Sequence, residues 1–219
     1  MLLIYVAIGV IVAVITGWFL YQNRMEFWET QARSAFRMAL GEELQKRNEV
    51  DVYFSSSGNI RLPDNSIDIK KEPIKVRIES EYGVKDFFIS YEKHSHNIER
   101  SSDMRASYSY VLYKSPLQAD SLNRIWYRLL EEMNYFGKTV VRISVADWDE
   151  RETYTFSDDS LYMLKPDSLM SCYLGYRCEI GVTGYLYYSW LNVFTVKDKI
   201  LLCALALCCF LLFFLQDTL

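Results

Sequence analysis

The chain has 219 residues and a formal net charge of −4, and this mildly acidic balance argues against nucleic-acid binding, which needs a basic face. Its 17 Tyr and 12 Phe, against only 9 Gly and 4 Pro, exclude a disordered linker and predict an ordered domain. The length suits one domain of ordinary size plus two membrane segments. The apolar residues are concentrated at the two ends of the chain, where such segments would lie.

The N-terminal stretch is a predicted transmembrane helix. Residues 2–21 are apolar and long enough to cross the hydrocarbon layer, at about 1.5 Å per residue against about 30 Å. Aromatic side chains at the far end of this stretch suit the membrane–water interface. A cleaved signal peptide would need basic residues before the apolar run and a small-residue cleavage site, and the sequence has neither. We therefore assign residues 1–21 to an uncleaved first span.

The sequence after this span predicts an amphipathic helix over residues 25–47. Apolar residues recur there at helical spacing and define one face: Trp28, Ala32, Ala35, Phe36, Ala39, Leu40 and Leu44. Basic residues occupy the rest of the helix surface. Two interpretations stay open and are compatible: a helix that couples the span to a sensor domain, and the first core helix of that domain.

The next part of the chain shows the alternation that is typical of β-strands. Alternating or β-favouring residues predict strands at residues 50–54, 74–78, 84–91 and 105–113, the last of which is rich in tyrosine. Turn-forming residues separate the first of these strands from the second. We expect the strands to pair antiparallel with one face buried.

The clearest helix is predicted over residues 115–137. Pro116 precedes it, Asp120 or Ser121 can cap its N-terminus, and Gly137 ends it. Its buried face is expected to be a continuous apolar stripe: Leu122, Ile125, Trp126, Leu129, Leu130 and Met133.

Three further strands complete the predicted domain, at residues 139–145, 153–156 and 176–183, and we expect the second to pair with the first. These elements predict an α+β fold, with an antiparallel sheet and two packed helices, flanked by two transmembrane helices. The extramembrane, sensor-like domain is assigned to residues 22–196.

The C-terminal apolar run predicts a second span. Residues 200–215 carry no charge, proline or glycine, and the aromatic residues of 185–194 suit the interface before them. At about 1.5 Å per residue this run reaches only about 24 Å, short of about 30 Å, unless residues 193–196 or 216–219 extend it. We assign residues 197–219 to this second span and a short tail.

Side chains that could carry chemistry are sparse. His94 and His96 would share one face of a strand and could start a zinc or copper site. Glu92 and Glu99 are the nearby candidates for a third ligand, but the polar stretch around them favours an exposed loop. The sequence contains no nucleophile elbow, zinc-protease helix, phosphate loop or dinucleotide fingerprint.

Two other groups of side chains are candidates for chemistry. Asp147, Asp149 and Glu150 form an acidic cluster whose spacing matches no cation-binding loop, so a solvated turn is favoured. Cys172 and Cys178 could face each other across a hairpin, either as a disulfide or as two buried thiols. The sequence therefore predicts no enzyme, no catalytic residue, no metal site and no cofactor.

Three stretches carry a resemblance to a known family. Residues 115–147 (SPLQADSLNRIWYRLLEEMNYFGKTVVRISVAD) resemble the extracytoplasmic sensor segment of Bacteroidetes membrane-anchored regulators. Residues 174–190 (LGYRCEIGVTGYLYYSW) are similar to the segment that leads into the second span of those proteins, and the N-terminal span with its amphipathic helix fits as well. The family is that of the membrane-anchored winged-helix transcriptional regulators, with the sensors of histidine kinases as near neighbours.

The resemblance implies a periplasmic sensor domain between two spans of a bacterial inner membrane, with a cytoplasmic output domain after the second span. Only residues 216–219 follow the second apolar run here, so we expect no output domain and no nucleic acid bound directly by this chain. A cytoplasmic or membrane partner would then supply the output, and a homodimer stays open. The expected function is signal transduction, and the alternative is a structural or interaction subunit of a membrane or envelope complex.

The orientation in the membrane follows from two conflicting signals. Basic residues near both spans lie on the domain side, which by the positive-inside rule would place the domain in the cytoplasm. The resemblance places the domain in the periplasm, and we favour that orientation.

Overall fold

The computed structural model describes residues 2–48, 72–80, 83–135, 137–158, 162, 168–187 and 193–217. The predicted strand at residues 50–54 lies outside these residues. The chain divides into two compact units. The larger unit comprises Arg33–Asn134 and Lys138–Tyr187, and the smaller one comprises Met1–Ala32, Tyr135–Gly137 and Tyr188–Leu219.

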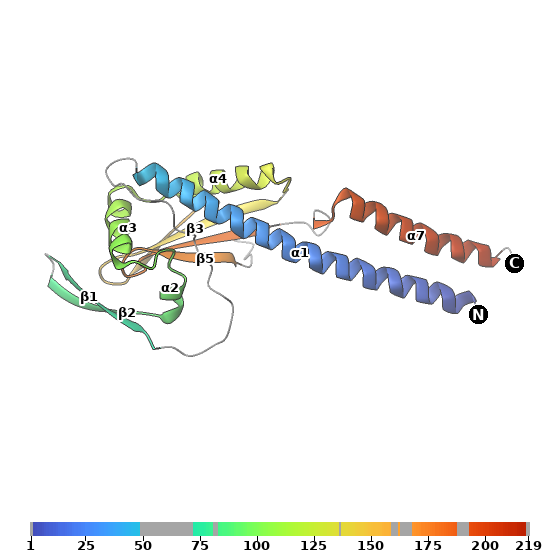
Figure 1. Cartoon of the computed structure of the whole chain (residues 1–219), viewed down its shortest axis with the longest axis horizontal. Helices are drawn as coiled ribbons and strands as arrows, with labels where there is room; N and C mark the ends of the chain where they lie inside the picture. Colours follow the sequence, from blue (N-terminus) through green and yellow to red (C-terminus); the bar gives the residue numbers. More distant parts are fainter. Residues whose placement is uncertain are drawn as a thin grey trace. The chain divides into compact units, whose positions relative to one another are not determined.

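The larger unit is built on a four-stranded antiparallel sheet with the strand order β4-β3-β6-β5 (Figure 1). The strands are β3 (Lys138–Ala146), β4 (Glu152–Phe156), β5 (Ser168–Leu174) and β6 (Ile180–Tyr187). The expected pairing of residues 153–156 with the strand before them is confirmed. Strand β5 was not predicted, and β6 begins at Ile180 because residues 175–178 form the turn before it.

Two helices place large side chains against one face of this sheet. Helix α1 (Leu2–Asn48) reaches the sheet with its C-terminal part, beside helix α4 (Ala119–Glu132) (Figure 1). The rings of Phe36 and Trp126 meet edge to face, with centroids 4.8 Å apart, and both side chains are fully buried. The α+β class, the antiparallel sheet and the helix predicted at residues 25–47 are therefore confirmed.

The start of α4 differs from its prediction. Gln118 is the N-cap residue, and it forms no side-chain capping hydrogen bond. Neither Asp120 nor Ser121 is the cap, because both lie inside the helix, and the Ser121 hydroxyl donates to the Glu43 carboxylate at 3.1 Å. The predicted apolar stripe is largely confirmed, since Leu122, Ile125, Trp126 and Leu130 are buried.

The predicted strand at residues 105–113 is wrong, because helix α3 (Ser102–Lys114) occupies this stretch. Alternating Ser and Tyr imitate the two-residue period of a strand. The buried residues are Tyr108, Val111 and Leu112, which follow the three- and four-residue spacing of a helix face. The polar stretch before α3 also begins with a short helix, α2 (Tyr91–Ser95), which Ser90 caps by accepting a hydrogen bond from the Lys93 N–H.

The two strands predicted at residues 74–78 and 84–91 are confirmed as an antiparallel hairpin, β1 (Ile74–Ser80) and β2 (Gly83–Ile89). The ring of Phe87 on β2 meets that of Trp148 edge to face at 5.2 Å, and the Lys85 ammonium donates to the Trp148 carbonyl at 2.6 Å. These contacts fix the hairpin to the turn between β3 and β4.

The smaller unit contains the N-terminal part of α1 and helix α7 (Val196–Asp217), which run side by side (Figure 1). A methyl group at Gly17 would lie 3.5 Å from Leu202 Cδ2, so the two helices are in contact there. Among the residues that the structure describes, no helix is both long enough and apolar enough to cross a lipid bilayer. The two flanking spans are therefore not confirmed.

Gly184 and Gly41 should respond oppositely to an added methyl group. A Cβ at Gly184 would lie 2.9 Å from Phe36 Cε2 and 3.1 Å from Trp126 Cη2, whereas one at Gly41 would meet nothing within 4 Å. We expect Gly184→Ala to lower the free energy of unfolding by about 1–3 kcal/mol through overpacking. Gly41→Ala should raise it by about 1 kcal/mol, because alanine favours a helix interior.

Urea titration of the full chain in detergent, followed by far-ultraviolet circular dichroism, checks both signs. A Gly184→Ala chain as stable as the unmodified one would show that the Phe36 and Trp126 rings do not pack against Gly184.

Candidate functional site

The two histidines do not share a strand face, because neither lies on a strand. His94 lies in α2, and His96 is the C-cap residue of that helix. The His96 Nδ1 atom lies 2.8 Å from the Glu92 carbonyl oxygen, and burial together with the charge of Arg105 lowers the pKa of His94. Among the described residues, no three His, Cys, Asp or Glu side chains come together as a metal site.

The acidic cluster forms the turn between β3 and β4. The Asp147 Oδ1 atom accepts hydrogen bonds from the N–H groups of Asp149 and Arg151 at 2.8 and 2.9 Å. Glu150 takes a positive φ of 65° within this turn. Asp147 therefore stabilises the turn, as an aspartate at this position commonly does.

Cys172 and Cys178 are two free, buried thiols, so of the two alternatives the disulfide is absent. The Cys172 thiol donates to the Val182 carbonyl at 3.6 Å, whereas the Cys178 sulfur accepts from the Asn97 amide at 3.3 Å. Burial raises the pKa of Cys172 to about 12.

We expect Cys172 to resist alkylation in the folded chain. A thiol with a pKa of about 12 holds almost no thiolate at pH 8, and the thiolate is the nucleophile. Iodoacetamide at pH 8 followed by peptide mass spectrometry should leave Cys172 unmodified in native protein and modify it in urea. Rapid labelling of Cys172 before unfolding would contradict the buried placement.

The first group of side chains that could serve a function lies in the smaller unit, where α7 begins beside α1. Arg24 and Asp198 form a two-point ion pair, with Nε–Oδ2 at 2.9 Å and Nη2–Oδ1 at 3.2 Å. The Asp198 side chain is only 8% exposed. Thr195 and Asp198 also exchange hydrogen bonds in the pattern of a capping box. The Asp198 carboxylate therefore both caps the N-terminus of α7 and pairs with Arg24 on α1.

Aromatic side chains extend this connection along α1. The Trp28 indole N–H donates to the Val193 carbonyl at 3.0 Å, and the Trp28 ring meets that of Tyr135 edge to face at 4.5 Å. Tyr21 and Phe194 have ring centroids 6.0 Å apart. We call this set of contacts the α1–α7 junction; its defining residues are Arg24, Trp28, Val193, Thr195 and Asp198.

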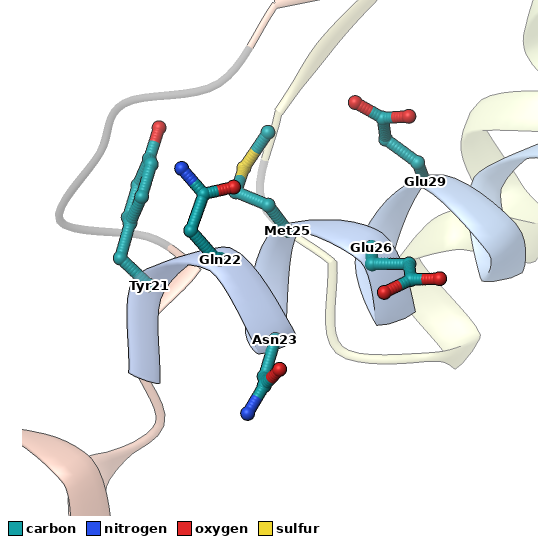
Figure 2. Close-up of a pocket in the computed structure, with 6 residues that line it drawn as sticks. All are labelled: Tyr21, Gln22, Asn23, Met25, Glu26 and Glu29. Carbon is teal, nitrogen blue, oxygen red and sulfur yellow. The ribbon is translucent and has the colours of Figure 1, made fainter. Parts of the chain in front are cut away.

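A shallow hollow of about 420 Å³ lies on α1 beside the junction. Figure 2 shows the residues that line it: Tyr21, Gln22, Asn23, Met25, Glu26 and Glu29. Tyr21, Gln22, Met25 and Glu29 project from one side of the helix, whereas Asn23 and Glu26 project elsewhere. All six residues belong to a single helix, so no second described element closes the hollow around a ligand, and we assign it no function.

The second group lies in the larger unit, on the sheet face opposite Phe36 and Trp126. Arg142 pairs with Thr183 on β6 and with Phe156 on β4, so these three side chains share one face. Val141 pairs with Gly184 on the face that Phe36 and Trp126 cover. Arg142 is thus a half-buried cation in the middle of a sheet.

Hydroxyl groups and aromatic rings surround this cation. The Arg142 Nη1 atom lies 3.4 Å from the Tyr162 hydroxyl, and Nη2 lies 3.4 Å from the Thr183 hydroxyl. The rings of Tyr154 and Tyr185 each lie 5.7 Å from Arg142 Cζ. Burial raises the pKa of Tyr185 to about 12, so its hydroxyl stays protonated at neutral pH. We call these five residues the Arg142 cluster.

The sequence contains a signal for each of these two groups. An arginine between the apolar residues Val141 and Ile143, inside a predicted strand, marks a charge on a largely buried sheet. Thr195 and Asp198 stand at capping-box spacing directly before an apolar run. The pairing of Asp198 with Arg24 could not be read from the sequence, because the two residues are far apart along the chain.

Comparisons of this chain with protein-family models, with curated proteins and with solved structures find no significant match.

Proposed function

We propose that this protein is a non-catalytic, membrane-anchored signal-transduction protein. Its α+β unit senses a ligand or a state of the cell envelope, and α1 and α7 pass the signal toward the membrane. The observation that carries this proposal is helix α1, which is unbroken from Leu2 to Asn48. Its C-terminal part buries Phe36 in the α+β core, and its earlier part is tied to α7 by Arg24. Helix α1 therefore contributes residues to both units.

Exposed apolar side chains support membrane anchoring by the two helices. On α1, seven large side chains are 48% to 66% exposed: Val10, Ile11, Val12, Val14, Ile15, Trp18 and Phe19. Ile200, Leu201 and Leu207 on α7 are exposed as well. Exposed apolar surface of this extent marks a membrane or protein interaction site. Because the sequence stays apolar over residues 2–21 and 200–215, a bilayer is the partner that suits both helices.

The proposed location is the bacterial inner membrane, with the α+β unit in the periplasm. Tyr113 is 86% exposed, so Tyr113→Cys offers a labelling site in a chain whose Cys203, Cys208 and Cys209 are replaced by serine. A membrane-impermeant maleimide should label this cysteine in intact cells. Labelling only after lysis would place the unit in the cytoplasm, and extraction of the chain by alkaline carbonate would refute anchoring.

The signalling proposal predicts that the α1–α7 junction communicates with the α+β core. Asp198→Asn weakens the ion pair with Arg24 and the capping box of α7 at the same time. We expect this variant to speed amide hydrogen exchange in residues 33–48 of α1, as well as at the start of α7. Hydrogen exchange of the full chain in lipid nanodiscs, read by mass spectrometry, measures both regions.

Lys197→Gln is the matched control, because Lys197 is an exposed neighbour at the start of the same helix. It should leave exchange in residues 33–48 unchanged. If Asp198→Asn speeds exchange at the start of α7 alone, the junction only anchors α7, and the transmission role fails.

A second candidate function is that of an interaction subunit of a membrane or envelope complex. The β1–β2 hairpin favours it, because Val84 and Phe88 are 59% and 65% exposed on its outer face. A photocrosslinking amino acid at Phe88 should then capture a single defined partner in cells. Absence of a crosslinked product would leave signal transduction as the better supported function.

A further inference from the structure

We propose that the Arg142 cluster is a binding site for a small organic carboxylate with an apolar or aromatic body. The cluster consists of Arg142, Tyr154, Tyr162, Thr183 and Tyr185, and lies on the sheet face opposite Phe36 and Trp126. The inference does not require the signalling role proposed above. If both hold, the carboxylate is the signal that the α+β unit senses.

The guanidinium of Arg142 has weak hydrogen-bond partners for a half-buried cation. Its two Nη contacts, to Tyr162 and Thr183, are both 3.4 Å long, beyond the usual 2.7–3.2 Å range. Its Nε atom is buried and has no hydrogen-bond partner among the described residues. A buried donor without an acceptor costs free energy, and an acceptor on a bound ligand would recover part of that cost.

Glu152, a carboxylate close enough to be influenced by the charge of Arg142, is engaged elsewhere. Glu152 pairs with the Lys93 ammonium at 2.8 Å and accepts from the Tyr154 hydroxyl at 2.6 Å. Hydrogen bonds from Lys93 and Tyr154, and the charge of Arg142, hold the pKa of Glu152 below its usual value. The charge of Arg142 contributes to the lowered pKa of Glu152. In the described residues, however, the two side chains form no ion pair with each other. Within the part of the chain that the structure describes, no carboxylate is paired with the Arg142 guanidinium, which we assign to a ligand anion.

The geometry of the cluster selects the class of anion. A guanidinium is a planar fork that matches a carboxylate with two parallel hydrogen bonds. The hydroxyl groups of Tyr162, Tyr185 and Thr183 can also act as hydrogen-bond donors to an anion at this site. The Tyr162 ring also stacks at 4.3 Å against Phe156 and meets Tyr185 at 5.3 Å. These rings offer apolar contact to the body of the ligand, as is common in small-molecule sites.

Benzoate and its neutral isostere benzamide are the probes for this site. Isothermal titration of the full chain in nanodiscs, with empty nanodiscs as the blank, should show one benzoate bound per chain. Benzamide and acetate should bind at least about tenfold more weakly, because they lack the charge or the apolar body. Equal binding of benzoate and benzamide, or no binding of benzoate at millimolar concentrations, would overturn the proposal.

Arg142→Gln should weaken benzoate binding by about tenfold or more, through loss of a charge-assisted hydrogen bond. Arg128→Gln is the matched control, since Arg128 is 53% exposed and pairs with Glu42 on the surface of the larger unit. Its affinity for benzoate should equal that of the unmodified chain. Unchanged affinity in Arg142→Gln, or an equal loss in Arg128→Gln, would refute the site.

Photolabelling of the unmodified chain with 4-benzoylbenzoate keeps the test decisive if Arg142→Gln does not fold. Adducts should map to β3, β4, β6 or Tyr162 and should diminish when benzoate competes. Adducts confined to other segments would overturn the proposal. Because binding and photolabelling do not depend on hydrogen exchange in α1, failure of this site and failure of the signalling role are distinguishable.

Discussion

Replacing Trp126 with alanine should lower the free energy of unfolding by about 3–5 kcal/mol, the range for truncation of a fully buried large aromatic side chain. Trp126 is 0% exposed and meets the equally buried Phe36 edge to face at 4.8 Å. Its loss leaves a cavity between α1, α4 and β6. Because domains of this size are stable by only about 5–15 kcal/mol, we expect partial unfolding and low yield.

Tyr127→Ala is the matched control, since Tyr127 follows Trp126 on the same helix and is 39% exposed. It should change the free energy of unfolding by less than about 1 kcal/mol. Urea titration of both full-length variants, followed by far-ultraviolet circular dichroism, measures the difference. Equal stability of the two variants would show that α4 presents another face to the sheet.

The α+β class could be predicted because elements that bury only one face show a clear pattern in the sequence. Apolar residues recur every three or four positions in such helices and every second position in such strands. The stripe from Leu122 to Leu130 repeats every three or four residues, and the structure buries that stripe. The same reasoning failed at α3, where Tyr108 and Tyr110 alternate with serine. Of these two tyrosines only Tyr108 is buried, and its partners are Val111 and Leu112 on the next turn. A short amphipathic stretch rich in Tyr and Ser fits both periods, and tertiary packing decides between them.

The sites were harder to predict than the fold, because they depend on residues that the sequence keeps apart. The spacing of the two histidines is that of metal ligands on one strand face, yet His94 lies in a short helix and His96 at its end. Arg142 carried no motif, and its hydroxyl and aromatic neighbours come from β4, β6 and the segment around Tyr162. Strand order and register create that cluster, and neither could be deduced from the sequence of a single strand.

A second network, around Glu43, holds the C-terminal end of α1 in the larger unit. Glu43 is 1% exposed, and its carboxylate lies 2.7 Å from Arg47 and 3.1 Å from the Ser121 hydroxyl. Arg47 also donates to the carbonyl oxygens of Ser115 and Pro116, which precede α4. One buried ion pair thus joins α1 to the connection between α3 and α4.

Removing only one charge of the Glu43–Arg47 ion pair should strongly lower the free energy of unfolding. In Arg47→Met the Glu43 carboxylate stays buried without its cation, and we expect the free energy of unfolding to fall by about 3–5 kcal/mol at neutral pH. Lys46→Met is the control, because Lys46 is 53% exposed and pairs with the surface residue Glu42. Its effect should stay below about 1 kcal/mol, as for other exposed ion pairs.

Removing both charges should restore most of the stability that Arg47→Met loses. The double variant Glu43→Leu with Arg47→Met leaves no buried charge, and two apolar side chains of similar volume fill the space. The carbonyl groups of Ser115 and Pro116 are exposed enough to bond water instead. We expect the double variant to lie within about 1–2 kcal/mol of the unmodified chain, measured by urea titration. A double variant no more stable than Arg47→Met would mean that Arg47 acts through the two carbonyl groups, and that its pairing with Glu43 contributes little.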